Sequence, residues 1–159
     1  MSEIKIEKVT TRDAAEISGL AQQLILHHVR FSKSYATVPN FGKIQLAHIR
    51  KQLRKSKNVA FKAVENGRIV GFALVEAKKH PPIYKKRYYA YVDSIMVSPG
   101  HRVKGVGSKL LDAAVAWARK RRSGEMQLTV DSKNAAAMHL YEKKGFREHR
   151  KIMKKLLRH

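Results

Sequence analysis

The sequence predicts one mixed α/β domain over residues 1–159, and three features of the chain indicate it. Two helical patterns occupy the first third, a run of strands with one hairpin follows, and strands then alternate with helices. A chain of 159 residues suits one domain with one substantial core. Because no repeat, low-complexity segment or linker interrupts it, we expect no second domain.

The first third predicts a strand and two helices. Alternating apolar residues favour a strand near 4–9, and Thr10 and Asp13 have capping-box spacing for a helix. Residues 31–43 indicate a loop, and a second helix is expected at 44–55. The stripe of the first helix is Ile17, Leu20, Ala21, Leu24 and His28.

Strand patterns dominate the middle of the chain. The Asn-Gly pair at 66–67 is the strongest short-range hairpin signal, and it separates the runs 58–64 and 68–77. Residues 78–86 contain two prolines, which indicates a loop. The aromatic and β-branched run 88–97 predicts another strand.

In the last third, strands and helices alternate. An amphipathic helix follows a glycine-rich turn, and residues 125–130 predict a short strand. A turn at 131–134 opens a helix over 135–144, which Gly145 ends. A last strand is predicted to begin at Phe146.

The net charge of +22 is unusual for a globular domain, since 34 Lys and Arg residues face only 12 Asp and Glu residues. Such a field attracts phosphates, nucleic acid, anionic lipid or acidic protein surfaces. The cations are spread along the chain, so we assign the charge to the folded body. Without cysteine, the chain forms no disulfide, thiolate metal site or cysteine nucleophile, and we expect no metal. The N-terminus lacks a signal peptide and no run spans a bilayer, which predicts a cytoplasmic protein without a membrane partner.

The stretch "VSPGHRVKGVGSKLL" places two glycines and two cations where a helix begins. Unpaired backbone N–H groups at a helix N-terminus bind anions, and glycine allows a phosphate to approach closely. Arg102 and Lys104 add positive charge to the turn that contains Gly105 and Gly107. The stretch matches neither the dinucleotide fingerprint nor the P-loop. Alone it is either a pyrophosphate cradle or a strand-to-helix turn with incidental charge.

A second motif makes the sequence resemble the GNAT superfamily of acyl-CoA-dependent N-acetyltransferases. The superfamily's R/Q-x-x-G-x-G/A motif is matched by Arg102, Gly105 and Gly107. Its second signature is an Asn before a helix reading A-x-x-L-Y-E-K-x-G-F, and Asn134 and "AMHLYEKKGF" match it. The resemblance covers about residues 59–146. It implies a mixed, mostly antiparallel sheet of about six or seven strands flanked by about four helices, with acetyl-CoA as acyl donor.

The resemblance also implies how acetyl-CoA would lie. The backbone at the end of the strand 88–97 would bind the pantetheine arm, the glycine-rich turn would hold the pyrophosphate, Asn134 would bind the arm and Tyr141 would approach the sulfur. The expected cofactor-binding residues are Ile95, Met96, Val97, Arg102, Val103, Lys104, Gly105, Val106, Gly107, Ser108, Asn134, Ala137 and Tyr141.

Acetyl transfer to an amine needs a proton donor for the departing thiolate and a route for the amine's proton. Tyr141, with an ordinary pKa of ~10, is the predicted general acid, and core packing is the alternative. Asp93 is the predicted base, because alternation places it on one strand face with Ile95 and Val97. Polyamine-acetylating members of the superfamily carry a carboxylate at the matching place. A structural salt bridge is the alternative for Asp93, and Glu76 or water is the alternative base.

The sequence therefore predicts an N-acetyltransferase that transfers the acetyl group of acetyl-CoA directly to a primary amine. The acceptor could be a protein N-terminus, a lysine or a small amine, and the basic surface favours an acceptor on an acidic protein or the ribosome. The sequence leaves a homodimer open. The rival interpretation is a basic nucleic-acid- or ribosome-binding module without catalysis.

Overall fold

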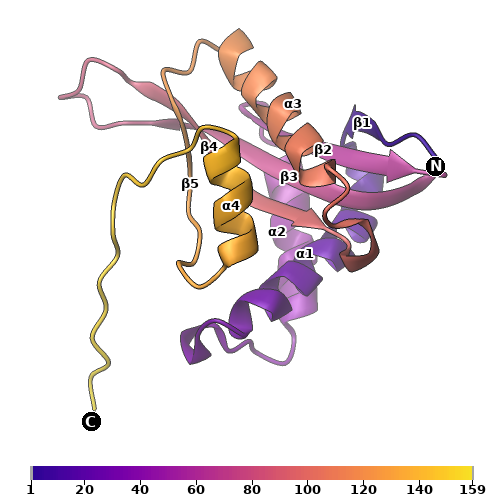
Figure 1. Ribbon diagram of the computed structural model, residues 1–159, viewed down its shortest axis with the longest axis horizontal. Helices are drawn as coiled ribbons and strands as arrows, with labels where there is room; N and C mark the ends of the chain where they lie inside the picture. The colour runs from indigo at the N-terminus through magenta and orange to yellow at the C-terminus, as the bar shows by residue number, and fades with distance from the viewer. Residues whose placement is uncertain (1, 159) are drawn as a thin grey trace.

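The computed structural model describes residues 2–158 and confirms the mixed α/β class (Figure 1). One sheet has the order β1-β2-β3-β4-β5, in which every neighbouring pair is antiparallel except β4 and β5, which are parallel. The strands are β1 (Lys5–Lys8), β2 (Asn58–Glu65), β3 (Arg68–Lys79), β4 (Tyr88–Val97) and β5 (Met126–Leu128). The helices are α1 (Ala14–Val29), α2 (Phe41–Leu53), α3 (Val106–Lys120) and α4 (Ala135–Lys143).

Helices cover both faces of the sheet (Figure 1). α1 and α2 pack on one face, over a cluster that includes Ile17, Ile49 and Phe72. α3 and α4 lie on the opposite face, where Leu110 and Leu111 are fully buried. Because helices cover both faces of the sheet, side chains on both faces of β3 are buried, which explains why its sequence is a nearly continuous apolar run.

The predicted hairpin is confirmed. β2 and β3 pair up to Glu65 and Arg68, and the two residues between them form the turn. Asn66 has φ 50° and Gly67 has φ 74°, the left-handed conformations that a tight two-residue hairpin requires.

The second helix begins three residues earlier than predicted. Gly42 lies inside α2 rather than in the preceding loop. A Cβ at this position would come within 2.9 Å of Gln22 Oε1 on α1. This atom is at the end of a flexible side chain, so a Cβ here would displace the Gln22 amide and need not separate the helices.

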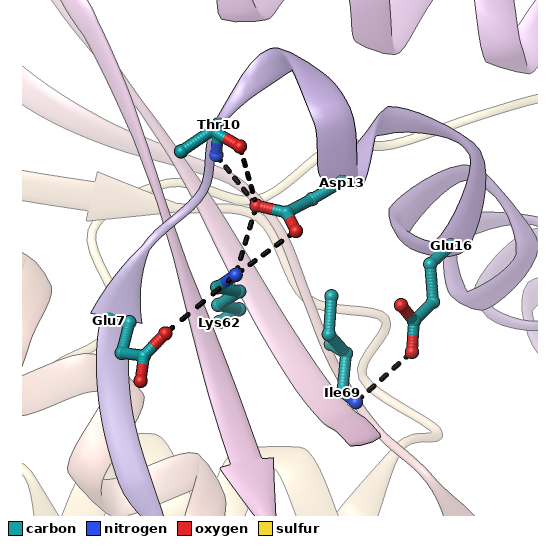
Figure 2. A network of polar contacts seen from close by, with 6 residues as sticks. All are labelled: Glu7, Thr10, Asp13, Glu16, Lys62 and Ile69. Atoms are coloured by element: carbon teal, nitrogen blue, oxygen red, sulfur yellow. Dashed lines mark hydrogen bonds and ion pairs between the residues drawn. The ribbon is translucent and has the colours of Figure 1, made fainter. Parts of the chain in front are cut away.

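A polar network fixes the start of α1 against the sheet (Figure 2). The predicted capping box forms: the Thr10 backbone N–H donates to Asp13 Oδ2 at 2.7 Å. Lys62 Nζ on β2 lies 3.0 Å from Asp13 Oδ1 and 3.7 Å from Glu7 Oε2. Burial alone would raise the pKa of Asp13, but the hydrogen bonds from Thr10 and Lys62 outweigh it and lower the pKa. Glu16 accepts a further bond from the Ile69 backbone N–H.

The predicted final strand does not form, so the sheet has five strands rather than six or seven. Residues 146–158 contain neither helix nor strand and extend away from α4 (Figure 1). Their apolar residues come as adjacent pairs, 152–153 and 156–157, instead of alternating as a strand with one buried face would require. No strand among residues 2–158 pairs with them.

Residues 2–158 include no helix long and apolar enough to cross a membrane.

Candidate active site

The candidate site lies where β4 and β5 stop pairing. The ladder between them runs only from Ala90 and Met126 to Val92 and Leu128, whereas β4 continues to Val97. Beyond the ladder is a cavity of about 270 Å³. Its wall is formed by Leu24, His28, Phe31, Tyr35, Tyr91, Val92, Asp93, Ser94, Ile95, Leu128, Thr129, Val130, Asp131, Asn134, Ala137 and Tyr141.

A β-bulge in β4 aims Asp93 away from the face that the sequence predicted. Ser94 pairs with Leu74 and Val92 pairs with Val75, so Asp93 between them has no partner on β3. The bulge reverses the alternation, because Val92 and Ile95 now pack in one cluster. The prediction that Asp93 shares a strand face with Ile95 is therefore wrong. Bulges commonly re-aim side chains beside active sites.

The Asp93 carboxylate forms no ion pair with any of residues 2–158. It is exposed, lines the cavity and accepts a hydrogen bond from Ser94 Oγ at 3.2 Å. Glu76, the alternative base, lies 3.8 Å from Lys78 Nζ and does not line the cavity. The same ammonium lies 3.9 Å from the centre of the Tyr91 ring. The two carboxylates on neighbouring strands thus have different surroundings.

Tyr141 on α4 is both a core residue and a wall of the cavity. It is 9% exposed and packs with Val92 and Leu111. Its ring lies edge-on to the ring of Phe146, with 5.9 Å between the two ring centroids. Burial raises the pKa of Tyr141 to about 12. The phenol therefore keeps its proton throughout the neutral range, as a proton donor must.

Asn134 holds the beginning of α4. Its Oδ1 accepts a hydrogen bond from the Ala137 backbone N–H at 3.2 Å, which makes it the helix N-cap. Because Asn134 also lines the cavity, its side-chain amide is the group that could bind a ligand there.

The glycine-rich turn leaves the start of α3 without a side-chain cap. Gly105 is the N-cap residue, with φ 77°, and no side chain caps the helix. Val103 has φ 63°, a conformation that is costly for a β-branched residue and is typical of functional turns. Backbone N–H groups of successive residues in such turns can form a concave anion-binding site. The first N–H groups of α3 therefore have the geometry to hold a phosphate.

Side chains of the turn brace it against the sheet. Arg102 Nε donates to the Val97 carbonyl at 3.1 Å, which folds the guanidinium back onto the end of β4. His101 Nε2 lies 2.7 Å from Glu65 Oε2 at the end of β2. A Cβ at Gly107 would approach Leu140 Cδ2 to 3.0 Å. Gly107 thus permits close packing of α3 against α4, a second reason for glycine at that position.

The structure brings four further residues to the cavity from the first third of the chain, and sequence reasoning did not assign them to the site. Leu24 and His28 lie on α1, and Phe31 and Tyr35 follow it. His28 is exposed by surface area, although its contacts at the cavity wall desolvate the imidazole enough to lower its pKa. A histidine within an apolar helical stripe was the available signal, but it gave no indication of which strand α1 covers.

At the end of β5, Asp131 also lines the cavity and was not predicted. Its Oδ1 accepts a hydrogen bond from the Lys133 backbone N–H at 2.9 Å, which shapes the turn before α4. Like Asp93, it takes part in none of the ion pairs of residues 2–158. The cavity therefore contains two carboxylates without an ion-pair partner in a strongly basic chain.

Comparisons with curated proteins give N-acetyltransferase relatives. The YhfO protein of Bacillus subtilis, an uncharacterised N-acetyltransferase, is 28% identical over 145 residues and covers 91% of both chains. Streptothricin acetyltransferase of Streptomyces lavendulae is 44% identical over 55 residues, 35% of this chain and 29% of the relative. The ribosomal protein bS18-alanine N-acetyltransferase of Escherichia coli is 31% identical over 88 residues, 55% of this chain and 54% of the relative. The matched segment thus spans 29% of the length of the Streptomyces protein and 54% of the length of the Escherichia coli protein.

Solved structures share the fold. Aminoglycoside N-acetyltransferase AAC(6')-Iy in complex with CoA superposes with a TM-score of 0.79 at 20% identity, covering 99% of this chain and 97% of the other. A predicted acetyltransferase from Clostridium acetobutylicum with acetyl-CoA also gives 0.79 at 18% identity, covering 97% and 96%.

The family comparison agrees with the motifs and with the geometry of the cavity. The model of the acetyltransferase (GNAT) family matches residues 25–146, which include the glycine-rich turn, both strands that border the cavity and the helix that carries Tyr141. The chain belongs to the acetyltransferase (GNAT) family.

Proposed function

We propose that this protein is an N-acetyltransferase that transfers the acetyl group of acetyl-CoA directly to a primary amine. One observation carries the proposal: a protonated phenol, Tyr141, and a carboxylate without an ion-pair partner, Asp93, line the same cavity between two separating strands. CoA and acetyl-CoA are present in solved structures of the same fold, which supports the choice of donor.

The separation of β4 and β5 provides a place for the pantetheine arm. Beyond Val92, the edge of β4 that faces β5 has no strand partner, so backbone groups from Ser94 to Val97 can bond an extended ligand. At the end of β4, the uncapped N-terminus of α3 would hold the pyrophosphate. The acetyl thioester would then lie in the cavity beside Tyr141.

The reaction needs no covalent intermediate with the protein. The amine nitrogen attacks the thioester carbonyl, the C–N bond forms, and collapse of the tetrahedral intermediate breaks the C–S bond. Asp93 accepts the ammonium proton, directly or through water, so that the attacking nitrogen has a free lone pair. The products are the N-acetylated amine and coenzyme A with a thiol.

Tyr141 acts on the departing sulfur. A thiol has a pKa of about 8.5, so transfer of a proton from a phenol with a pKa of about 12 to a free thiolate is unfavourable. The phenol therefore stabilises the developing negative charge by a hydrogen bond while the C–S bond breaks. Protonation is completed with the proton that the amine has lost.

The acceptor approaches as a cation. Asp93 and Asp131 give the cavity a local negative charge, although the chain as a whole is strongly positive. An ammonium group is the natural partner for both carboxylates. The relatives act on two kinds of acceptor, the small molecule streptothricin and an alanine of ribosomal protein bS18. Both a small amine and a protein N-terminus therefore belong in the acceptor test, together with a lysine peptide.

The test combines binding with turnover. Calorimetry should detect acetyl-CoA binding, and a panel of small amines, polyamines and peptides should show amine-dependent release of free coenzyme A. The rival function, nucleic-acid binding without catalysis, predicts high-affinity RNA or DNA binding and no acetyl-CoA binding. That combination would overturn the proposal.

A further inference from the structure

Two basic segments that are far apart in sequence meet at one end of the sheet. The loop between β3 and β4, residues 80–87, projects from the body of the molecule (Figure 1). The turn after α3 lies against the base of this loop: the Gly124 backbone N–H donates to the Tyr88 carbonyl at 3.2 Å, and a Cβ at Gly124 would lie 3.4 Å from Lys86 Cδ. The two segments form one basic patch, whose exposed cations are Lys79, Lys85, Lys86, Arg87, Arg119, Lys120, Arg121 and Arg122.

The positive charge of the basic patch is not neutralised within the chain. None of its cations forms an ion pair with any of residues 2–158. Glu125 is the one carboxylate in the segments 79–88 and 117–125. Its Oε1 lies 3.0 Å from His80 Nε2 and accepts a hydrogen bond from Gln127 Nε2 at 2.6 Å. A dense group of unpaired cations repels itself and attracts polyanions.

The basic patch is distant from the candidate active site. α3 has 15 residues, so the glycine-rich turn at its start and the basic patch at its end are roughly 22 Å apart at 1.5 Å per residue. No cation of the basic patch lines the cavity. A pyrophosphate held at the start of α3 therefore does not explain the charge, which indicates a second anionic partner.

The turn after α3 contains an arginine where glycine would be more stable. Ser123 N–H donates to the Ala118 carbonyl and Arg122 N–H to the Arg119 carbonyl, both at 3.0 Å, which are the two bonds of a Schellman cap. Arg122 is the left-handed residue of this cap, with φ 55°, a conformation that favours glycine. Strained residues of this kind are typical of functional positions. Here the strained position adds a further cation to the basic patch.

Exposed aromatic rings lie among the cations. Tyr84 is 56% exposed and Tyr88 is 53% exposed. His80 supports the base of the loop, because its ring stacks on Tyr89 with 4.4 Å between the centroids and lies edge-on to Tyr84 at 6.1 Å. The bases of a single strand stack on exposed rings while its phosphates contact neighbouring cations. An acidic peptide would use the cations alone.

We propose that the basic patch binds single-stranded nucleic acid, with phosphates on its cations and bases stacked on Tyr84 and Tyr88. Four of the eight cations are arginines, whose planar guanidinium groups bind phosphate through two parallel hydrogen bonds. This second binding surface is inferred from charge, exposure and the left-handed arginine. It stands independently of the proposed acetyl transfer.

The first test measures binding of a fluorescently labelled single-stranded RNA of about 12 nucleotides by anisotropy, over a range of salt concentrations and without acetyl-CoA. The variant Lys85→Gln with Lys86→Gln and Arg87→Gln should bind the RNA about tenfold more weakly or worse. Its plot of log affinity against log salt should be less steep by about 2, because each phosphate contact on a single strand contributes about 0.7 to the slope.

The matched control removes the same charge from the other face of the sheet. Lys43→Gln with Lys51→Gln and Lys57→Gln changes three exposed cations in α2 or shortly after it, and this variant should bind the RNA nearly as tightly as the unsubstituted protein. An equal loss of affinity in the loop variant and in this control would overturn the proposal, because the net charge alone would then explain the binding.

Arg122→Gly separates binding from folding. Glycine relieves the left-handed conformation, so the melting temperature should be retained or rise, whereas RNA affinity should fall by about threefold or more because a phosphate contact is lost. Unchanged RNA affinity in both Arg122→Gly and the loop variant would overturn the proposal.

The aromatic rings distinguish nucleic acid from an acidic protein. Tyr84→Ala should weaken RNA binding by about tenfold, because a base loses its stacking partner. Ile83→Ala is the control, since Ile83 is 82% exposed and has no aromatic face. Polyglutamate of equal charge should displace the RNA poorly. Polyglutamate that competes as well as unlabelled RNA, with normal RNA binding by Tyr84→Ala, would overturn the proposal in favour of an acidic protein partner.

Discussion

Burial gives Tyr141 the property that the proposed chemistry requires. The ring is enclosed by Val92, Leu111 and Phe146, and this enclosure raises the pKa of the phenol to about 12. Core packing of the ring and a protonated hydroxyl that can donate a hydrogen bond to the departing sulfur are therefore compatible in one environment.

The variant Tyr141→Phe keeps the ring packing and removes the hydroxyl. Turnover should fall by roughly 10²–10³-fold, the usual range for loss of one hydrogen-bond donor to a developing negative charge. Acetyl-CoA affinity and melting temperature at neutral pH should change little, because the phenyl ring still fills its site. The measurement is kcat with a saturating amine, and near-normal turnover would leave Tyr141 a packing residue only.

The raised pKa also predicts a stability effect that is independent of activity. Between pH 10 and about 12 the unfolded phenol ionises while the folded phenol does not, so the unfolded state is favoured progressively as pH rises. Tyr141 should therefore lower stability across this interval, by an upper limit of roughly 2–3 kcal/mol for a shift of about two pKa units. The decline in melting temperature should be shallower in Tyr141→Phe.

The role of Asp93 as the base can be tested against Glu76, the alternative base that the sequence suggests. Asp93→Asn should lower kcat/KM for the amine by roughly 10²-fold or more, while acetyl-CoA affinity is retained. Glu76→Gln is the control, since Glu76 pairs with Lys78 and lies outside the cavity wall. An activity loss in Glu76→Gln but not in Asp93→Asn would reverse the assignment.

At the scale of secondary-structure elements, much of the fold follows from local sequence. The Asn-Gly turn, the capping box at Thr10 and the alternation of strand and helix after residue 88 all act through neighbouring residues, so the chain itself reveals them. The β-bulge at Asp93, by contrast, is defined by the register with the neighbouring strand β3. Such tertiary features do not alter the local pattern, and this is why the face of Asp93 was predicted wrongly.

The glycine-rich turn allows a matched comparison within one segment. Gly105→Ala forces a side chain into a left-handed conformation, at a cost of roughly 1–2 kcal/mol. If the turn shifts to avoid that cost, acetyl-CoA should bind about tenfold more weakly. Gly100→Ala should have no effect, because Gly100 has no positive φ and its Cβ would meet open space. Equal acetyl-CoA affinity in a folded Gly105→Ala variant would exclude the turn from the phosphate site.

At the scale of the whole molecule, the sequence predicted the family and the parts of the site that its motifs contain. It did not predict His28, Phe31, Tyr35 or Asp131, because their place at the cavity depends on how α1 and the end of β5 pack around β4. The predicted final strand from Phe146 does not form, because the apolar residues after it come as adjacent pairs and do not alternate.

The charge of +22 gives a prediction about the acceptor. For an amine on an acidic macromolecule, kcat/KM should fall steeply between low and moderate salt, because exposed charges more than ~10 Å apart are screened at 0.1 M salt. A short peptide amide whose only charged group is its amine serves as the control and should show little salt dependence. Equal salt dependence for both acceptors would make the surface charge irrelevant to acceptor binding.

The most direct test of the proposed acetyl transfer measures the release of free coenzyme A from acetyl-CoA by the purified protein. The release is followed with and without a panel of amines, in parallel for the unsubstituted protein and for Tyr141→Phe. The account predicts release that depends on at least one amine, yields the acetylated amine in equal amount and is lost in the variant. Acetyl-CoA that is neither bound nor consumed with any amine, by a folded protein, would contradict it.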